Sequence, residues 1–487
     1  MGIETDMALP SILSQIGNSL LSPGDLSNLF SLDFSSPDLA TLQNDILDKS
    51  YDIAAQIQSR NYFGGDWPGF NEFVLSYMTF VRDVDPYDLA ESYPLIEKLF
   101  TDLQVAFSNR RGAILTPIVG KIAGIVTNLA ISLDSGKYSI VEDNISANVL
   151  ASNGVAGEHM PRTSEIAKVL LKLFNSIRGE RLTNENAQTS KKEVILYVAV
   201  LLCRAYFKLN QPSACANVFS NIHTANISFS RYPRSEKVTY RYYLGRFYFL
   251  RQELLRARTH LLWAFNNCHS AAVSNQRAIL TYLIPSNLVL GVGTRPHLYE
   301  LVGDTLRGAF GPLEKAVRSG DLYAFNAHLV RYFDWFVSKK MFLLLRSKAQ
   351  IIIFRNLFRR IDAIVTASAP PLEPGTKRPN DLAFDDLLIG VRLSTRQNDP
   401  ALAAQASQAS PENPAILPYS NLNEMSWTYD DVENICISLI DQGFMKANIY
   451  ARSKLLRLMP SGGFPRIAEV WAARGQISGD EEAWMDR

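Results

Sequence analysis

Apolar residues recur at helical spacing along most of the chain. In residues 193–210 and 213–225, apolar or small side chains stand three and four positions apart, and Gln211-Pro212 separates the two segments. This spacing places the apolar residues on one face of an α-helix, and a Gln-Pro pair indicates a break between helices. The two segments are therefore predicted to form a helical hairpin.

A second hairpin follows, with small residues at helical offsets. Gly245, Ala257 and Ala264 stand where tetratricopeptide-like (TPR-like) hairpins carry small side chains. We expect these residues to let two facing helices approach closely, with Tyr248 and Leu261 filling the space beside them.

A third hairpin is predicted at residues 312–336. Its turn is Ser319-Gly320-Asp321, where the glycine can end one helix and the aspartate can cap the next. Hairpins of this kind stack into a right-handed helical solenoid. The predicted fold class is therefore all-α.

The pattern changes after residue 365. A Pro-rich break leads to a short amphipathic helix at 382–393, and the polar residues 394–428 are expected to be a disordered insertion. A helix at 429–442 follows, and then two strands with a tight turn near Arg452-Ser453. Helices followed by a β-ribbon predict a winged-helix domain with a small wing.

These patterns divide the chain into four parts. They are an acidic helical region (1–160), TPR-like repeats (161–337), a winged-helix part with the insertion (338–460), and a last helix with a frayed acidic tail (461–487).

The net charge of +1 over 487 residues conceals an uneven distribution of acidic and basic residues along the chain. Residues 1–150 hold 8 Lys and Arg against 19 Asp and Glu, whereas residues 231–366 hold 21 against 8. A basic centre of this kind attracts acidic partners or phosphates.

Several classes of function lack their sequence signals. No nucleophile, nucleotide-loop or metal-ligand motif is present, so we expect neither an enzyme, nor a cofactor, nor a metal site. No apolar run reaches the ~20 residues of a membrane-spanning helix, so no membrane contact is expected. The cysteines lie far apart and are predicted to be buried thiols of a reducing compartment: Cys203, Cys215, Cys268 and Cys436.

Residues 240–458 resemble a known module. The segments "YYLGRFYFLRQELLRARTHLLWAFNNC", "NQRAILTYLIPSNLVLG" and "MFLLLRSKAQIIIFRNLFRRI" are similar to the PCI module of the proteasome lid, the signalosome and the translation-initiation complex. Its helical part would begin at about residue 234. Within that family they look most like the branch of the PCI subunit of the TREX-2 messenger-RNA export complex, which is also filed as signalosome subunit-12-like.

The resemblance implies a non-enzymatic scaffold rather than a homo-oligomer. Its expected partners are the large TREX-2 scaffold subunit, a small acidic disordered subunit shared with the proteasome lid, and RNA or DNA bound without sequence preference. It implies a nuclear location that includes the nuclear-pore periphery, with some protein in the cytoplasm. The alternative is a protein-interaction subunit of a signalosome or proteasome-lid-like assembly that binds no nucleic acid.

Residues 338–361 carry seven cations and no acid. Lys348, Arg355 and Arg359 lie at i, i+7 and i+11, and are predicted to form one exposed stripe of a single helix, beside a buried face that contains Phe354. The cations could pair with acids of the chain, or bind an external anion, either phosphate or an acidic chain. Acids are nearly absent nearby, which favours the external anion.

The wing adds further cations, whereas helix 429–442 is acidic, so binding by charge without base reading is predicted. The predicted nucleic-acid-binding residues are Lys339, Lys340, Arg346, Lys348, Arg355, Arg359, Arg360, Lys446, Arg452, Lys454 and Arg457. The predicted partner-binding residues, for an acidic peptide, are Arg246, Arg251, Arg256 and Arg258.

Overall fold

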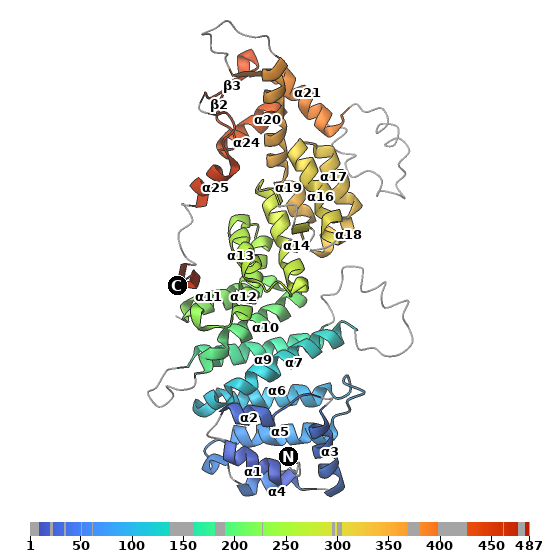
Figure 1. The fold of residues 1–487 in the computed structure, drawn as a ribbon, viewed down its shortest axis with the longest axis vertical. Helices are drawn as coiled ribbons and strands as arrows, with labels where there is room; N and C mark the ends of the chain where they lie inside the picture. Colours follow the sequence, from blue (N-terminus) through green and yellow to red (C-terminus); the bar gives the residue numbers. More distant parts are fainter. Residues whose placement is uncertain are drawn as a thin grey trace. The chain divides into compact units, whose positions relative to one another are not determined.

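The structure is a computed structural model, and contacts divide the chain into two compact units (Figure 1). The first unit comprises residues 1–243 and 482–487, and the second comprises 244–481. Each unit is described by itself. The structure describes residues 9–19, 23–33, 36–49, 51–60, 62–136, 160–180, 190–225, 227–294, 298–299, 304–368, 380–397, 426–460, 462–475 and 483–486.

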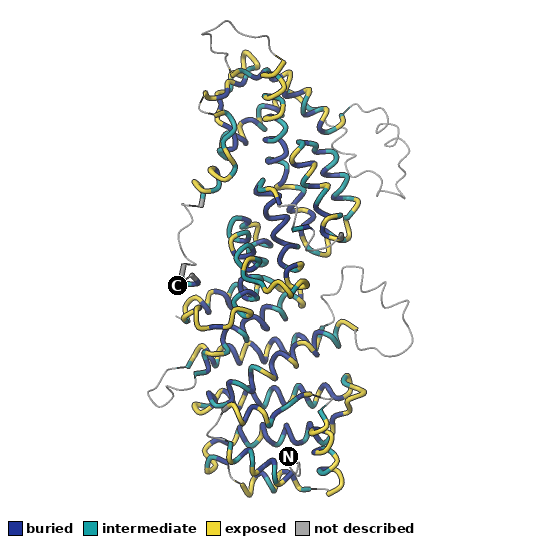
Figure 2. Tube along the Cα trace, in the orientation of Figure 1, coloured by how far each residue is buried: buried dark blue, intermediate teal, exposed yellow. Residues whose placement is uncertain are grey.

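The first unit is built from helices. Buried residues follow the faces on which neighbouring helices meet (Figure 2). Its elements are α1 (Leu9–Ser19), α2 (Pro23–Leu29), α3 (Pro37–Lys49), α4 (Ile53–Arg60), η1 (Tyr62–Gly65), α5 (Pro68–Asp83), α6 (Tyr93–Ser108), η2 (Arg110–Leu115), α7 (Thr116–Asp134), α9 (Pro161–Arg178), η4 (Lys191–Val194), α10 (Ile195–Lys208), η5 (Pro212–Ala214), α11 (Cys215–Thr224), η6 (Phe229–Arg231), the first part of α12 (Arg234–Leu250) and η9 (Ala483–Asp486).

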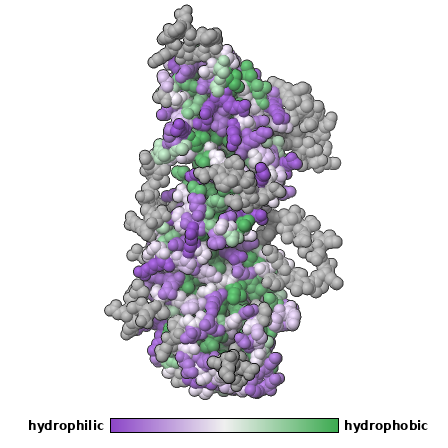
Figure 3. Space-filling model, viewed as in Figure 1, coloured by the Kyte–Doolittle hydropathy of each residue, from purple (hydrophilic) through white to green (hydrophobic). Residues whose placement is uncertain are grey.

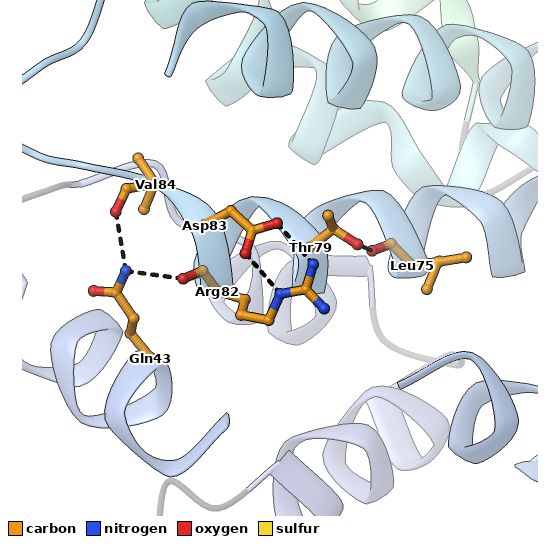
Figure 4. A network of polar contacts seen from close by, with 6 residues as sticks. All are labelled: Gln43, Leu75, Thr79, Arg82, Asp83 and Val84. Carbon is orange, nitrogen blue, oxygen red and sulfur yellow. Dashed lines mark hydrogen bonds and ion pairs between the residues drawn. The ribbon is translucent and has the colours of Figure 1, made fainter. Parts of the chain in front are cut away.

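Helices α5 and α6 form a hairpin whose ends are fixed by side-chain hydrogen bonds. The indole Nε1 of Trp67, at the start of α5, donates to the carbonyl oxygen of Ala106 in α6 at 3.1 Å. At the other end, Nε2 of Gln43 in α3 donates to the carbonyl oxygens of Arg82 and Val84 at 3.2 and 2.9 Å (Figure 4). The two Gln43 bonds satisfy carbonyls at the C-terminal end of α5.

One stretch, residues 110–134, is long and apolar enough to span a membrane by length and composition alone. The expectation that no run reaches this length was therefore wrong. Within it, 67% of the apolar 18-residue window is buried in the folded unit, where α7 packs against α6, α9 and α10. It has the burial of a core helix.

The predicted hairpin at residues 193–225 is confirmed as α10 and α11, with η5 at the Gln211-Pro212 break. The prediction of a frayed tail is wrong for its last described part. Residues 483–486 form η9, which packs on η6 in the first unit, and Met485 is buried. The sequence pattern of a four-residue segment cannot reveal where it packs. The residues that η9 contacts lie far away in sequence.

The second unit continues the hairpins and ends in a small sheet. Its elements are the end of α12, then α13 (Leu254–Asn267), α14 (Val273–Val289), α16 (Asp304–Ser319), α17 (Leu322–Arg331), α18 (Phe333–Ser338), α19 (Phe342–Lys348), α20 (Gln350–Ser368), β1 (Asp381–Ala383), α21 (Phe384–Thr395), α24 (Tyr429–Asp441), β2 (Ala447–Tyr450), η8 (Ala451–Ser453), β3 (Leu455–Leu458) and α25 (Ile467–Gly475).

Close packing of the two predicted hairpins is confirmed. A Cβ atom at Gly245 would lie 2.7 Å from Cγ of Leu261, so only glycine fits where α12 meets α13. In the turn between α16 and α17, Gly320 has φ +76° and its missing Cβ would lie 2.7 Å from Cα of Leu357 in α20. The Asp321 side chain accepts a hydrogen bond from the Ala324 amide at 2.8 Å, as a helix N-cap does.

The end of the unit is a winged helix. Helices α20, α21 and α24 pack together, and β2 and β3 pair antiparallel around η8, which confirms the predicted turn near Arg452-Ser453. A third strand, β1, was not predicted. It pairs with β3 in a sheet of order β1-β3-β2. Along the chain, the elements follow one another as α20, β1, α21, α24, β2 and β3, which is the order found in a winged helix. Most of the predicted insertion, residues 398–425, lies outside the described residues.

Residues 338–361 do not form one helix, contrary to the prediction. The chain turns at Lys339 and Lys340, where Lys340 has φ +57° and the amide of Met341 donates to the carbonyl oxygen of Phe336. This six-to-one bond is a Schellman ending of α18. A second interruption, at Ala349, separates α19 from α20. Neither break contains glycine or proline, so local sequence gave no signal for them.

Candidate nucleic-acid interface

Arg355, at the centre of the predicted exposed stripe, is buried. Its side chain lies in α20 with 3% of the residue exposed. Its Nη1 donates to Oδ1 of Asn356 at 3.0 Å, and its Nη2 donates to the carbonyl oxygen of Pro465 at 2.7 Å. Burial lowers the pKa of this guanidinium, and the positive charge of Arg359 lowers it further. The prediction that Arg355 shares an exposed edge with Lys348 and Arg359 is therefore wrong.

The burial has a physical cause in the segment that follows the wing. Residues 462–467 lie against α20. The side chain of Ile467 lies close to Gly291 and Ile352, because a Cβ atom at Gly291 would meet Ile467 Cδ1 at 2.7 Å and Ile352 Cγ2 at 3.2 Å. This segment also joins the wing, since the amide of Lys446 donates to the carbonyl oxygen of Gly463 at 2.8 Å. Arg355 thus holds a structural segment in place beneath the surface.

Exposed cations remain in this unit, and several of them form no ion pair with any described acid. Five of these lie on or beside α19, α20 and the wing: Lys348, Arg359, Lys446, Arg452 and Arg466. We call these five residues the basic surface set. Arg359 lies one helical turn beyond Arg355, and Arg466 follows Pro465, the residue that Arg355 holds. Sequence reasoning missed Arg466, because its position depends on how the segment after the wing folds back onto α20.

The other cations of residues 338–361 are placed differently. Lys339 is partly buried, and burial lowers its pKa, with the positive charge of Arg246 as the second cause. Lys340 lies in the turn after α18. Arg346 is partly buried in the last turn of α19. Arg360 is exposed, but its Nη1 donates to the carbonyl oxygen of Ser319 at 2.7 Å.

Two of the predicted cations of the wing contact other residues of the same chain. Arg457 makes a two-pronged ion pair with Asp381 of β1, at 2.7 and 2.9 Å, and this pair raises the pKa of the guanidinium. The ammonium of Lys454 lies 3.8 Å from the ring centre of Tyr429. Arg457 is thus already matched by the chain's own acid, whereas Lys454 stays exposed beside an aromatic ring.

Helix α24 carries acids on its solvent side. Its first turn holds Asp430 and Asp431, and Asp431 closes a capping box with Thr428. Asp430 and Asp441 are exposed. These carboxylates would meet backbone phosphates if the helix entered a DNA groove, so the geometry disfavours base reading by α24.

The four predicted partner-binding arginines all contact residues of their own chain. The guanidinium of Arg246 lies 4.9 Å from the Tyr282 ring centre. Arg251 and Arg256 both pair with Glu253, at 2.9 and 3.3 Å. Arg258 Nε donates to Oδ1 of Asn287 at 2.8 Å, and burial lowers its pKa.

The winged helix also exposes apolar side chains. They include Ile389 and Leu393 of α21 and Ile437 of α24, which are 55, 73 and 48% exposed. Figure 3 shows hydrophobic and hydrophilic residues interspersed over the drawn face. Among the described residues, no three metal-ligating side chains come together.

Helical hairpins that run into a winged helix define a class of helical-repeat scaffold, and comparison with known proteins identifies the family. The chain is 31% identical over 406 residues to a PCI domain-containing protein of Schizosaccharomyces pombe, which covers 82% of this chain and 81% of the relative. The chain belongs to the family of PCI domain-containing proteins. No family model matches it.

Two further relatives have more specific names. The nuclear mRNA export protein THP1 of Saccharomyces cerevisiae is 25% identical over 403 residues, covering 79% of this chain and 80% of the relative. A protein CSN12 homolog of Neurospora crassa is 32% identical over 313 residues, covering 63% of this chain and 62% of the relative. These relatives agree with the branch that the sequence resembles, and they support a scaffold role of the PCI kind.

Proposed function

We propose that this protein is a non-enzymatic scaffold subunit of a TREX-2-type complex in the nucleus, and that it binds RNA or DNA by charge without sequence preference. Its proposed protein partners are a large scaffold subunit and a small acidic disordered subunit. Similarity to a nuclear mRNA export protein over 79% of the chain supports this complex and this location.

The observation that carries the nucleic-acid part is the basic surface set. Its five exposed cations lie on or beside α19, α20 and the wing, and no described acid neutralises them. Lysine and arginine at such positions bind phosphates by releasing condensed counterions, which needs no base contact. The acidic α24 fits this mode, because it supports no insertion into the major groove.

The affinity of two charge-reversal variants for single-stranded RNA tests the proposal. Arg359→Glu with Lys446→Glu removes two cations of the basic surface set. Lys98→Glu with Lys172→Glu makes the same change in net charge at exposed positions of the first unit. We expect the first variant to lose at least tenfold in affinity at ~0.1 M salt, and the control to lose less than threefold, because exposed charges beyond a Debye length are screened. Equal losses would contradict the proposal.

A protein-interaction role without nucleic acid is the second candidate. The exposed apolar residues of α21 and α24 favour it, since large apolar side chains exposed on packed helices are available for contact with a partner, and one relative is named a CSN12 homolog. On this alternative, both charge-reversal variants would bind RNA as weakly as the unchanged protein.

A further inference from the structure

The last described segment of the chain occupies a defined site on the first unit. Residues 483–486 form η9, and the ring of Trp484 packs edge-on against Phe229, with 5.6 Å between centroids and 81° between planes. The same indole lies 5.9 Å from the ring of His223. Met485 beside it is 4% exposed. An aromatic and an apolar side chain are thus anchored together.

The residues that receive this segment are held by their own unit. Phe229 of η6 lies 5.9 Å from the Tyr240 ring, and the guanidinium of Arg241 lies 5.8 Å from its centroid. Tyr240 packs in turn against Phe219 of α11. Residues of α11, η6 and α12 therefore hold the Phe229 ring in place through contacts that do not involve Trp484. We call this ring the phenylalanine platform.

The sequence of the tail and the receiving residues differ in charge. Residues 480–487 read DEEAWMDR, with four acids and one arginine. On the receiving side, Arg231 follows Phe229 in η6 and is exposed, as is His223 at the end of α11. Aromatic anchors with flanking opposite charges are a common basis for recognising short peptides.

The segment η9 and the surface that receives it belong to the same chain. Helix α25 belongs to the second unit and η9 belongs to the first, with only residues 476–482 between them. A segment of the same chain competes for such a site at an effective concentration of roughly millimolar. Even a peptide with a dissociation constant near ~10 μM would therefore fill the site almost completely from within the same chain.

We infer that the surface formed by His223, Phe229 and Arg231 is a peptide-binding site for short acidic segments that carry a Trp-Met pair. The chain's own residues 483–486 occupy it. A segment of the same chemistry on another protein would have to displace this internal occupant, so binding there is regulated by competition within the chain.

The affinity of a labelled peptide for two full-length chains tests this inference. The probe is a fluorescent peptide of residues 480–487, followed by anisotropy. Replacing Trp484→Ala and Met485→Ala in the full chain empties the site without altering the phenylalanine platform. We expect the emptied chain to bind the probe in the micromolar range, and the unchanged chain to bind it at least tenfold more weakly.

Two controls define the contrary results. A probe with Trp484→Ala should lose binding to the emptied chain, and His223→Asp in the emptied chain should weaken the unaltered probe severalfold by introducing a negative charge at an exposed position. The inference is overturned if the emptied chain does not bind the probe, if both chains bind it equally, or if the altered probe binds as well as the original. A dimer of the unchanged chain that Trp484→Ala dissolves would also overturn it, because the occupant would then come from a second copy.

Discussion

Nη2 of Arg355 donates a 2.7 Å hydrogen bond to the carbonyl oxygen of Pro465, a residue 110 positions further along the chain. This bond joins the first helix of the winged helix to the segment that leaves its wing. The cation Arg359 lies one helical turn beyond Arg355, and Arg466 directly follows Pro465. A buried arginine therefore fixes the backbone that presents exposed ones.

Replacing Arg355 with methionine should loosen this segment. Methionine keeps most of the side-chain volume but donates no hydrogen bond, and bonds to charged donors contribute roughly 1.5–3 kcal/mol. We expect a loss of that size in the free energy of unfolding of the second unit, with faster amide hydrogen exchange at residues 462–467. Arg359→Met is the matched control, for which a change within about 0.5 kcal/mol is expected at an exposed position. Equal effects of the two variants would show that the bond has no structural role.

Gly320 should tolerate no side chain. A Cβ atom there would lie 2.7 Å from backbone of Leu357, and the residue has φ +76°. Gly320→Ala should cost more than ~2 kcal/mol of stability in chemical denaturation, since both strain and overpacking oppose it. Gly311→Ala, in the preceding helix α16 and with no atom beyond its chain neighbours within 4 Å of the added Cβ, should cost less than ~1 kcal/mol, because only the adjacent Pro312 opposes a side chain there. Equal costs for the two variants would refute the packing explanation.

Glu236 should make the first unit less stable as the pH rises. Burial raises the pKa of its carboxyl from 4.5 to about 7, and its buried Oε2 has no hydrogen-bond partner among the described residues. Below pH 4.5 both states are protonated. Between pH 4.5 and 7 the unfolded chain releases its proton while the folded chain retains it, so stability falls with pH by roughly 1–3 kcal/mol.

The variant Glu236→Gln should remove this dependence. The thermal unfolding midpoints of the variant and the unchanged protein should be measured at pH 5 and at pH 8. The midpoint of the variant, relative to that of the unchanged protein, should be higher at pH 8 than at pH 5. A constant difference between the two proteins over this range would mean that the carboxyl does not titrate as stated.

Asp381 restrains a wing cation that could otherwise bind phosphate. Asp381→Asn removes the negative partner of Arg457, so we expect tighter binding to single-stranded RNA and a salt dependence steeper by about 0.7 in log–log slope, the contribution of one phosphate contact. Stability should change by less than ~1 kcal/mol, because the pair is solvent-exposed. Unchanged RNA affinity would place Arg457 outside the interface.

Periodicity and turn chemistry predicted the elements whose cause is local. The Asp321 cap, the Gly245 contact, helix α24 and the turn between β2 and β3 all follow from residues close together in sequence, and the structure confirms them. Strand β1 is only three residues long and is defined by pairing with β3, more than 70 residues later, so no local pattern marks it.

The candidate site was harder to predict, for the same reason. A helical wheel places Lys348, Arg355 and Arg359 on one stripe, but it reveals neither the break at Ala349 nor the segment that covers Arg355. Likewise, the match between Arg457 and Asp381 joins two strands distant in sequence. Charge composition therefore predicted that a basic surface exists, and tertiary packing decided which cations belong to it.

The salt dependence of RNA binding tests the central claim most directly. The observed binding constant for a single-stranded RNA, measured by filter binding from ~50 to ~300 mM salt, should fall with a log–log slope between about −2 and −3.5, as three to five phosphate contacts require. A slope near zero, or no measurable binding at the lowest salt, would contradict the account.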